Sequence, residues 1–331
     1  MSAFLSGDAM KKLMRVGFVF LFFISLVSAA FGDNFVNGLR AYNSGDYKQA
    51  HELWLLVSEQ GDGSGSNLAA AAQFYLGVMY HHGQGVPQND EEAVRWYRLA
   101  AEQWHDATEY SLIDEAQLNL GLMYARGQGV PQDYALAVKW FRLAAGQGNA
   151  EAQFDLGVMY YNGQGVTKDE EIAFNWYRLA AEQGYAAAQL YLGNMYSAGQ
   201  GVSKDENEAL KWFRLAAEQG NAEAQFALGA RYRNGQGVVR DNTEALNWYR
   251  LAATQGHAGA LLELGVMYRN GQGVPREEME SARFYRMAAE RGSVTAQFIM
   301  GVLYHQGQGL LQSDADSYSW YVVASANGNE M

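Results

Sequence analysis

A repeat of 36 residues runs through most of this 331-residue chain and limits its possible folds more than any other feature. One glycine series opens a G-Q-G motif, at Gly127, Gly163, Gly199, Gly235, Gly271 and Gly307, with Gly83 a longer step upstream. A second series has the same spacing, at Gly148, Gly184, Gly220, Gly256, Gly292 and Gly328. Internal similarity at a fixed period of about 20–50 residues is typical of solenoids and propellers. We therefore expect small units that stack on one another.

The first half of each unit predicts a helix. In the unit 149–184, Ala152, Leu156 and Tyr160 recur at i, i+4 and i+8, which places them on one helical face. Gly157 lies in the middle of this helix, where glycine costs about 1 kcal/mol relative to alanine. The same glycine recurs at 77, 121, 193, 229, 265 and 301. We expect it to allow close approach of a neighbouring helix, and the G-Q-G that follows to end the helix with a left-handed cap.

The second half of each unit predicts another helix. It begins at a recurring N-cap position, occupied by Asn89, Asp133, Asp169, Asp205, Asp241, Glu277 and Ser313, of which only the glutamate is a poor capping residue. Its bulky ring is Trp96, Trp140, Trp176, Trp212, Trp248 and Trp320, with Phe284 as the exception. We expect this ring to pack against small alanines, and each buried ring to contribute roughly 2–3 kcal/mol. The arginines at 98, 142, 178, 214, 250 and 286 are expected on the outer wall, paired with Asp or Glu of the next unit.

The repeated motif L-G-x-M-Y, then G-x-G-V, then A-x-x-W-[YF]-x-x-A-A-x-Q-G resembles the Sel1-like repeat, a relative of the tetratricopeptide repeat. The resemblance extends from about Asn34 to the C-terminus. It implies an all-α fold, a right-handed α/α solenoid of stacked helix-turn-helix repeats. It also implies an interaction scaffold that binds a peptide or protein partner in a concave groove. Such scaffolds serve varied partners, so the family does not specify this one.

The first 30 residues differ from the rest and predict a signal peptide. A basic stretch from Met10 to Arg15 precedes an apolar run, Val16–Val27, and small residues follow at Ser28–Ala30. The apolar run is short for a membrane span, although an uncleaved N-terminal anchor is an alternative. Translation can start at Met1 or Met10. We expect a periplasmic or secreted protein with no membrane insertion after signal cleavage. It has no disulfide, because it contains no cysteine.

The remaining sequence divides into a cap and seven repeats. Residues 31–61 predict an N-terminal capping hairpin of tetratricopeptide type. The repeats within 62–331 occupy about 68–104, 113–148, 149–184, 185–220, 221–256, 257–292 and 293–328. The second helix of the last repeat carries several Asp and Ser residues, which predicts a polar closing cap. The net charge of −12 disfavours nucleic acid as a partner, and we expect a monomer.

No catalytic arrangement is evident, and we expect neither an enzyme nor a cofactor. The acidic N-cap residues are needed for capping, and the methionines at 79, 123, 159, 195 and 267 have core spacing. His81 and His82 have no further His nearby, so we expect a solvated pair and no metal site. Cysteine-rich relatives have been linked to β-lactam binding or hydrolysis, but this chain has no Cys and no S-x-x-K. A cell-wall or β-lactam-related ligand binder or hydrolase remains the alternative function.

The face of the first helix opposite the packing residues varies between repeats, which predicts a binding surface. Its candidate residues are Tyr75, His81, His82, Asn119, Arg126, Asp155, Tyr161, Asn162, Tyr191, Asn194, Arg233, Glu263 and Arg269. Tyr and Arg frequently anchor interfaces; the alternative is a face that is merely solvated. Two insertions separate early units, and the second adds a possible recognition ridge at Trp104, His105 and Tyr110, unless these are tolerated surface loops.

Overall fold

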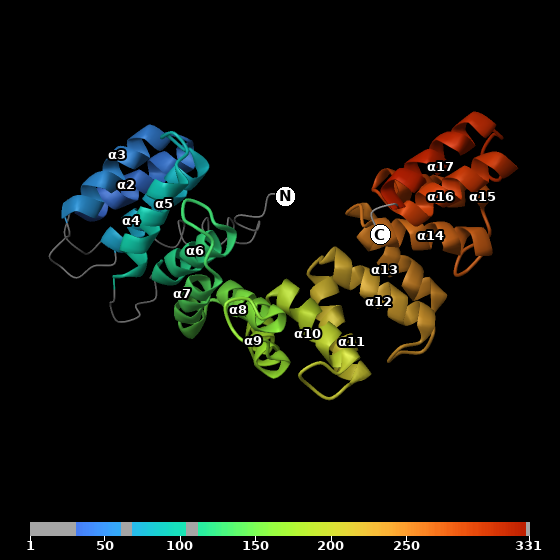
Figure 1. Cartoon of the computed structure of the whole chain (residues 1–331), viewed down its shortest axis with the longest axis horizontal. Coiled ribbons are helices and arrows are strands. Elements are labelled where there is room, and N and C mark those ends of the chain that lie inside the picture. The colour runs from blue at the N-terminus through green and yellow to red at the C-terminus, as the bar shows by residue number, and fades with distance from the viewer. Residues whose placement is uncertain (1–30, 61–67, 104–111, 329–331) are drawn as a thin grey trace. The chain divides into compact units, whose positions relative to one another are not determined.

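The computed structural model describes residues 31–60, 68–103 and 112–328, and within these ranges the chain forms sixteen α-helices and no strand. The helices belong to two compact units that divide between Asp169 and Glu170, and each unit is a succession of helical hairpins (Figure 1). The predicted fold class, an all-α, right-handed α/α solenoid of helix-turn-helix repeats, is confirmed. We call the two helices of each repeat its first helix and its second helix.

The N-terminal unit contains four first helices and three second helices among its described residues. Its helices are α2 (Phe31–Ser44), α3 (Tyr47–Gln60), α4 (Leu68–His82), α5 (Asp90–Ala101), α6 (Ile113–Arg126), α7 (Tyr134–Gly146) and α8 (Ala150–Asn162). Each helix packs on the next along the chain, and α4 also contacts both α2 and α6. The second helices α5 and α7 contact each other less than the first helices α4 and α6 do. The first helices of this unit are therefore closer together than its second helices.

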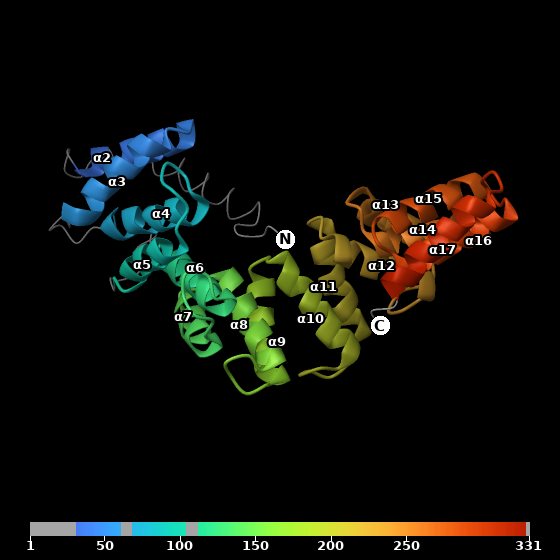
Figure 2. The ribbon, with the colours of Figure 1, turned by 45° about the horizontal axis from the view of Figure 1, so that its top comes forward.

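The C-terminal unit continues the same pattern with helices of nearly constant length. They are α9 (Glu170–Glu182), α10 (Ala186–Ala198), α11 (Glu206–Glu218), α12 (Ala222–Asn234), α13 (Asn242–Thr254), α14 (Ala258–Asn270), α15 (Glu278–Glu290), α16 (Val294–Gln306) and α17 (Asp314–Gly328). Both views show α16 and α17 packed side by side (Figure 1, Figure 2). Each buried cluster combines small alanines with one ring and two or three Leu or Met side chains.

The ring that packs on the mid-helix glycine is the residue after the tryptophan, which corrects the prediction. A Cβ atom on Gly265 would lie 2.7 Å from the ring carbons of Tyr285, so only glycine fits there. The corresponding pairs are Gly77–Tyr97, Gly121–Phe141, Gly193–Phe213, Gly229–Tyr249 and Gly301–Tyr321. Phe141 is fully buried, whereas the preceding Trp140 is 9% exposed. The glycine thus accommodates a ring from the second helix, rather than a bare backbone.

The helix ends follow the predicted capping chemistry. The side chains of Asn89, Asp133, Asp205, Asp241 and Ser313 accept hydrogen bonds from backbone N–H groups of the first turn. Glu277, the poor capping residue, makes no such bond. The first glycine of each G-Q-G has a left-handed conformation, as Gly127 does with φ of 68°. The second glycine lies against the start of the preceding second helix: a side chain on Gly129 would collide with the Asp90 carbonyl.

Successive repeats are joined by polar side chains that the sequence did not reveal. Five of the six recurring arginines donate to the hydroxyl of a tyrosine in the next first helix, at 2.5–2.8 Å, rather than to an acidic residue of the next unit as predicted. These pairs are Arg98–Tyr124, Arg142–Tyr160, Arg214–Tyr232, Arg250–Tyr268 and Arg286–Tyr304. The sixth, Arg178, forms an ion pair with Glu182 of its own helix at 3.2 Å. A buried glutamine adds a second link: Gln225 donates to the Ala217 carbonyl and accepts from Gln255.

The last hairpin does not end in the polar surface predicted for it. Phe298 on α16 is 56% exposed, and Tyr318 and Val322 on α17 are 71% and 48% exposed. The Asp and Ser residues that suggested a closing cap cluster in the first half of α17. The remainder of the helix therefore leaves apolar side chains at the surface.

Two predicted features lie outside the described residues. These are the signal peptide, residues 1–30, and the insertion residues Trp104, His105 and Tyr110. Among the helices that the structure describes, none combines the length and apolarity needed to cross a bilayer.

Candidate partner-binding face

The candidate residues lie on the first helices, and we call their surface the first-helix face. It is formed by the positions equivalent to Asp155, Val158, Tyr161 and Asn162 of α8 on every first helix. In the N-terminal unit these helices are the closely spaced ones, because α4 contacts both α2 and α6. A stack whose first helices lie closer together curves toward them, as expected for the inner side of a helical solenoid.

In the N-terminal unit the predicted anchor Tyr75 is withdrawn from the face. It is 2% exposed, and its ring stacks on Trp54 with the centroids 4.6 Å apart and the planes 16° apart. Tyr42 and Phe35 complete the aromatic cluster, which joins the first hairpin to α4. Burial strongly raises the pKa of the Tyr75 hydroxyl. The prediction that Tyr75 faces a partner is wrong, because the capping hairpin brings Trp54 over it.

His81 and Asn119 are also drawn inward. His81 is 7% exposed, and its Nδ1 lies 2.7 Å from Asp90 Oδ1 at the start of α5, so the predicted solvated histidine pair is wrong for this member. His82 is exposed at the surface, and partial desolvation of its ring together with the charge of His81 lowers its pKa. Asn119 is 8% exposed and donates to the Glu115 carbonyl within α6. These contacts stabilise helix ends and turns.

The N-terminal unit keeps a polar surface farther along, on α6 and α8. Arg126 and Asn162 are exposed, while Asp155 and Tyr161 are half-buried. Burial of the Asp155 carboxyl, reinforced by the charge of Glu151, raises its pKa to about 8 against the opposing charge of Arg126. Its Oδ2 is fully enclosed and has no hydrogen-bond partner among the described residues. Asp155 is therefore largely protonated at neutral pH.

In the C-terminal unit the first-helix face begins with an exposed aromatic residue. Tyr191 on α10 is 39% exposed, and its ring lies 5.3 Å from that of Tyr177. Asn194, one turn further along α10, is also exposed. The next first helix, α12, presents the small, half-buried side chains of Ala227 and Ala230. A large ring beside small residues is a surface on which a partner side chain can pack.

The charged residues of this unit are held in place by the core tyrosines. Arg233 forms an ion pair with Glu263 on the next first helix, and both side chains are about one quarter exposed. Burial raises the pKa of Tyr249, while the hydrogen bond and charge of Arg233 oppose the rise. The exposed Arg269 bears the same relation to Tyr285. Since Arg233 is neutralised by Glu263, Arg269 gives the face its positive charge.

One charged residue, Arg231 of α12, lies within the core and was not predicted from the sequence. Arg231 is 6% exposed, forms a 2.6 Å ion pair with Glu206, and lies over the Phe213 ring at 4.4 Å. The signal was available, because position 231 interrupts the methionine series at 195 and 267. This pair ties α12 to the start of α11, so it strengthens the frame beneath the face.

No catalytic or metal-binding arrangement emerges from the described residues. Groups of three or more His, Asp or Glu side chains placed to hold a metal ion are not found among them. The buried carboxyl of Asp155 has Glu151 and Arg126 as charged neighbours. The arrangement suits recognition through shape, aromatic contact and charge.

Comparisons with known proteins support the resemblance to the Sel1-like repeat that the sequence predicts. The model of the Sel1 repeat matches residues 70–103, 114–149, 150–185, 186–221, 222–257, 258–293 and 294–329. A structurally similar protein is a protective antigen present in uropathogenic Escherichia coli strains that displays an SLR fold, with 38% identity and a TM-score of 0.73. The match covers 82% of this chain but only 56% of that one.

A second solved structure, a Sel1 repeat protein from Oxalobacter formigenes, is 35% identical with a TM-score of 0.66. That match covers 77% of this chain and 96% of the other. The comparison with curated proteins finds no match. The predicted resemblance to the Sel1-like repeat is thus confirmed.

Proposed function

Because the chain belongs to the Sel1 repeat family, whose members generally serve as protein–protein interaction scaffolds, we propose that it binds a peptide or protein partner along its first-helix face. The observation that carries the proposal is the contrast within the C-terminal unit. Its packing glycines and alanines hardly change, whereas Tyr191, Asn194 and Arg269 are exposed and their positions hold other residue types in other repeats, namely Ala227, Ala230 and Ser197. A constant frame with a varied surface is what an adaptable binding protein requires.

The chemistry of the C-terminal unit suggests the kind of segment bound. Tyr191 offers an aromatic surface, and Arg269 offers an exposed guanidinium oriented by Tyr285. Tyr and Arg are enriched among residues that dominate binding energy. We infer a segment with an apolar side chain against Tyr191 and a carboxylate toward Arg269.

The proposed location is the periplasm or the outside of the cell, with the protein acting as a monomer. The sequence of residues 1–30 supports export, since it has the basic, apolar and small-residue regions of a signal peptide. The similar protein that is a protective antigen is consistent with this location. Export is tested by N-terminal sequencing of the protein from a cell-free supernatant or periplasmic extract, which should begin near residue 31.

Partner binding is tested with the immobilised full-length chain and a cell-envelope extract. We expect proteins recovered by the wild type to be lost from the variant Tyr191→Ala with Arg269→Ala. A matched control is Leu251→Ala on the second helix α13, where the side chain is 46% exposed; it should recover the wild-type set. Identical recovery by all three proteins would contradict binding through this face.

The proposed scaffold does not catalyse a reaction. Incubation of the full-length protein with nitrocefin or with muropeptides should give no turnover above buffer. Hydrolysis that disappears in the variant Asp155→Asn would contradict the proposal and favour a hydrolase of the cell envelope.

A further inference from the structure

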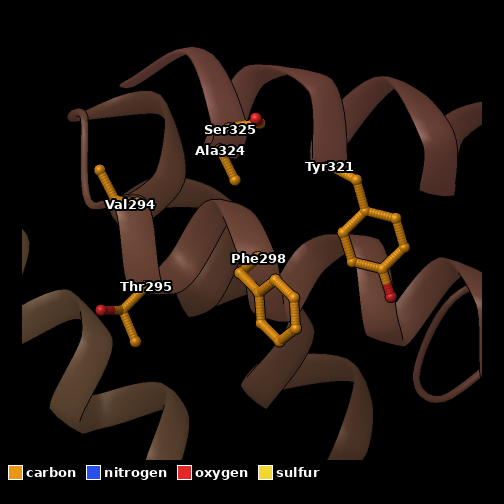
Figure 3. Close-up of a pocket in the computed structure, with 6 residues that line it drawn as sticks. All are labelled: Val294, Thr295, Phe298, Tyr321, Ala324 and Ser325. Carbon is orange, nitrogen blue, oxygen red and sulfur yellow. The ribbon is translucent and has the colours of Figure 1, made fainter. Parts of the chain in front are cut away.

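The C-terminal hairpin carries an open apolar depression of about 730 Å³ between α16 and α17. Its lining residues are Val294, Thr295, Phe298, Tyr321, Ala324 and Ser325. The Phe298 and Tyr321 rings border the same opening, with Ala324 and Ser325 above them on α17 (Figure 3). We call this surface the end face. It differs from the first-helix face because it includes the second helix α17.

The same surface exists one repeat earlier, where it is covered. Tyr285, Ala288 and Ala289 are equivalent to Tyr321, Ala324 and Ser325, and they are at most 2% exposed. They are buried by α16, whose Ala296 and Met300 belong to the same core cluster. The end face therefore continues an interface that the chain itself forms repeatedly.

The helices that cover this surface in the C-terminal unit share one chemistry. Each inserts an alanine and, four residues later, a leucine or methionine, as Ala224 and Leu228 do against Phe213. In α10, α12 and α16 the residue after the alanine is a glutamine that donates to a carbonyl of the covered helix, as Gln297 does to Ala289 at 3.1 Å, whereas α14 has Leu261 there. The carbonyl of Ser325 occupies the equivalent position on the end face.

The last hairpin departs from the earlier ones in a way that removes a polar contact. Arg214, Arg250 and Arg286 each donate to a tyrosine hydroxyl of the helix that covers them. Position 322 is Val322, which is 48% exposed. An occupant of the end face therefore requires an apolar residue where the internal helices have tyrosine.

The N-terminal hairpin excludes a second copy stacked head to tail. Gly38 of α2 meets Trp54 as Gly77 meets Tyr97, which fixes the register between α2 and α4. In that register Asp33, Asn37 and Arg40 replace Ala72, Leu76 and Met79. All three are exposed, so placing them on Phe298 and Tyr321 would bury polar and charged groups against apolar rings.

We propose that the end face docks a single amphipathic helix of another protein. The helix presents a small residue and a leucine or methionine four residues apart to Tyr321 and Ala324, with an apolar side chain against Val322. A side-chain amide beside the small residue donates to the Ser325 carbonyl. This site is independent of the proposed binding along the first-helix face.

The test uses the full-length protein and a labelled 14-residue peptide with the sequence of 149–162 and two changes. Glu151→Lys allows a lactam bridge to Asp155 that holds the peptide helical, and Tyr160→Leu supplies the apolar residue required against Val322. The peptide carries the required alanine and leucine at 152 and 156, and after bridging it has no charged side chain that could be attracted nonspecifically to the acidic protein. Fluorescence anisotropy should show saturable binding. It should weaken at least tenfold, about 1.4 kcal/mol, for Phe298→Glu and for a peptide with Leu156→Asp.

Two further variants make the result specific. Thr295→Lys, at an exposed position on the rim, should also weaken binding at least tenfold, whereas Tyr191→Ala should leave it unchanged. Absence of saturable binding, or equal binding by Phe298→Glu, would overturn the proposal. Sedimentation velocity adds a second criterion: concentration-dependent dimers that Phe298→Glu abolishes would show that a second copy occupies the end face, which also overturns it.

Discussion

The first-helix faces of the two units carry residues at equivalent positions, but these residues differ in how far they are exposed. In the N-terminal unit, Tyr75 and His81 are buried by contacts with Trp54 and Asp90. In the C-terminal unit, Tyr191, at the position equivalent to Tyr75, is 39% exposed. The difference arises because α4 follows a capping hairpin that supplies a large indole ring. The tyrosine at this position therefore stabilises the fold in the repeat next to the capping hairpin, and it remains available for binding in a regular repeat.

The largest expected effect separates these two tyrosines. Tyr75→Ala should lower the free energy of unfolding of the N-terminal unit by about 3–5 kcal/mol, because it empties the aromatic cluster. Tyr191→Ala should cost no more than about 1 kcal/mol, because its ring is partly exposed. Urea titration, with hydrogen exchange followed separately in each unit, measures both. Equal losses would show that the two faces do not differ as described.

The next effect should be the same in both units, since they share one core design. Gly77→Ala and Gly265→Ala each place a Cβ atom 2.7 Å from a buried tyrosine ring. Despite the better helix propensity of alanine, each change should cost about 1–3 kcal/mol through overpacking. Thermal unfolding of the two variants provides the measurement, with Gly146→Ala as control, because a Cβ there meets no atom within 4 Å. A stabilised Gly265→Ala protein would contradict the role assigned to the ring.

A smaller effect, dependent on pH, belongs to the N-terminal unit. The pKa of Asp155 is raised from 3.8 to about 8 in the folded state. Between these values the folded protein holds a proton that the unfolded chain has released, so the wild type loses stability as pH rises. Asp155→Asn removes this penalty and should raise the free energy of unfolding at pH 8 and change it little at pH 4. Urea midpoints at the two pH values test this; a gain that is equal at both would be inconsistent with the raised pKa.

The smallest effect concerns the link between repeats within the C-terminal unit. Arg250→Ala removes the 2.6 Å hydrogen bond to Tyr268, which lies at the surface. The expected loss is about 0.5–1 kcal/mol. In a double-mutant cycle with Tyr268→Phe, the coupling energy between the two side chains should account for most of that loss. A coupling energy near zero would mean that the ladder of arginine and tyrosine pairs adds nothing to stacking.

The period of the glycines and the N-cap residues were sufficient to predict the hairpins and where their helices begin. The identity of the packed ring was not predictable from Trp176–Tyr177, because both residues are aromatic and adjacent. Which of them meets the glycine depends on how the second helix is rotated against the first. The arginine partners were missed for a similar reason. The tyrosine hydroxyl that accepts a hydrogen bond from Arg142 belongs to a residue 18 positions away, in the next repeat.

The candidate site was only partly predictable. The periodicity identifies the helix face that varies, but it does not show which neighbour lies over each residue. Tyr75 and Tyr191 differ because of Trp54, 21 residues before Tyr75 and in an irregular hairpin. The apolar end of the last hairpin was missed because the polar residues on which the prediction rested, Asp314, Asp316, Ser317 and Ser319, fall in the first half of α17, whereas Tyr321 and Ala324 lie in the second half.

The most direct measurement is photo-crosslinking from the first-helix face of the C-terminal unit. The full-length protein carries a benzophenone amino acid in place of the exposed Asn194, and a matched protein carries it in place of Leu251 on α13. After irradiation in the presence of the envelope extract, the account predicts a discrete protein adduct from position 194 that Tyr191→Ala diminishes, and none from position 251. No adduct from position 194, or the same adducts from both positions, would contradict a partner bound to this face.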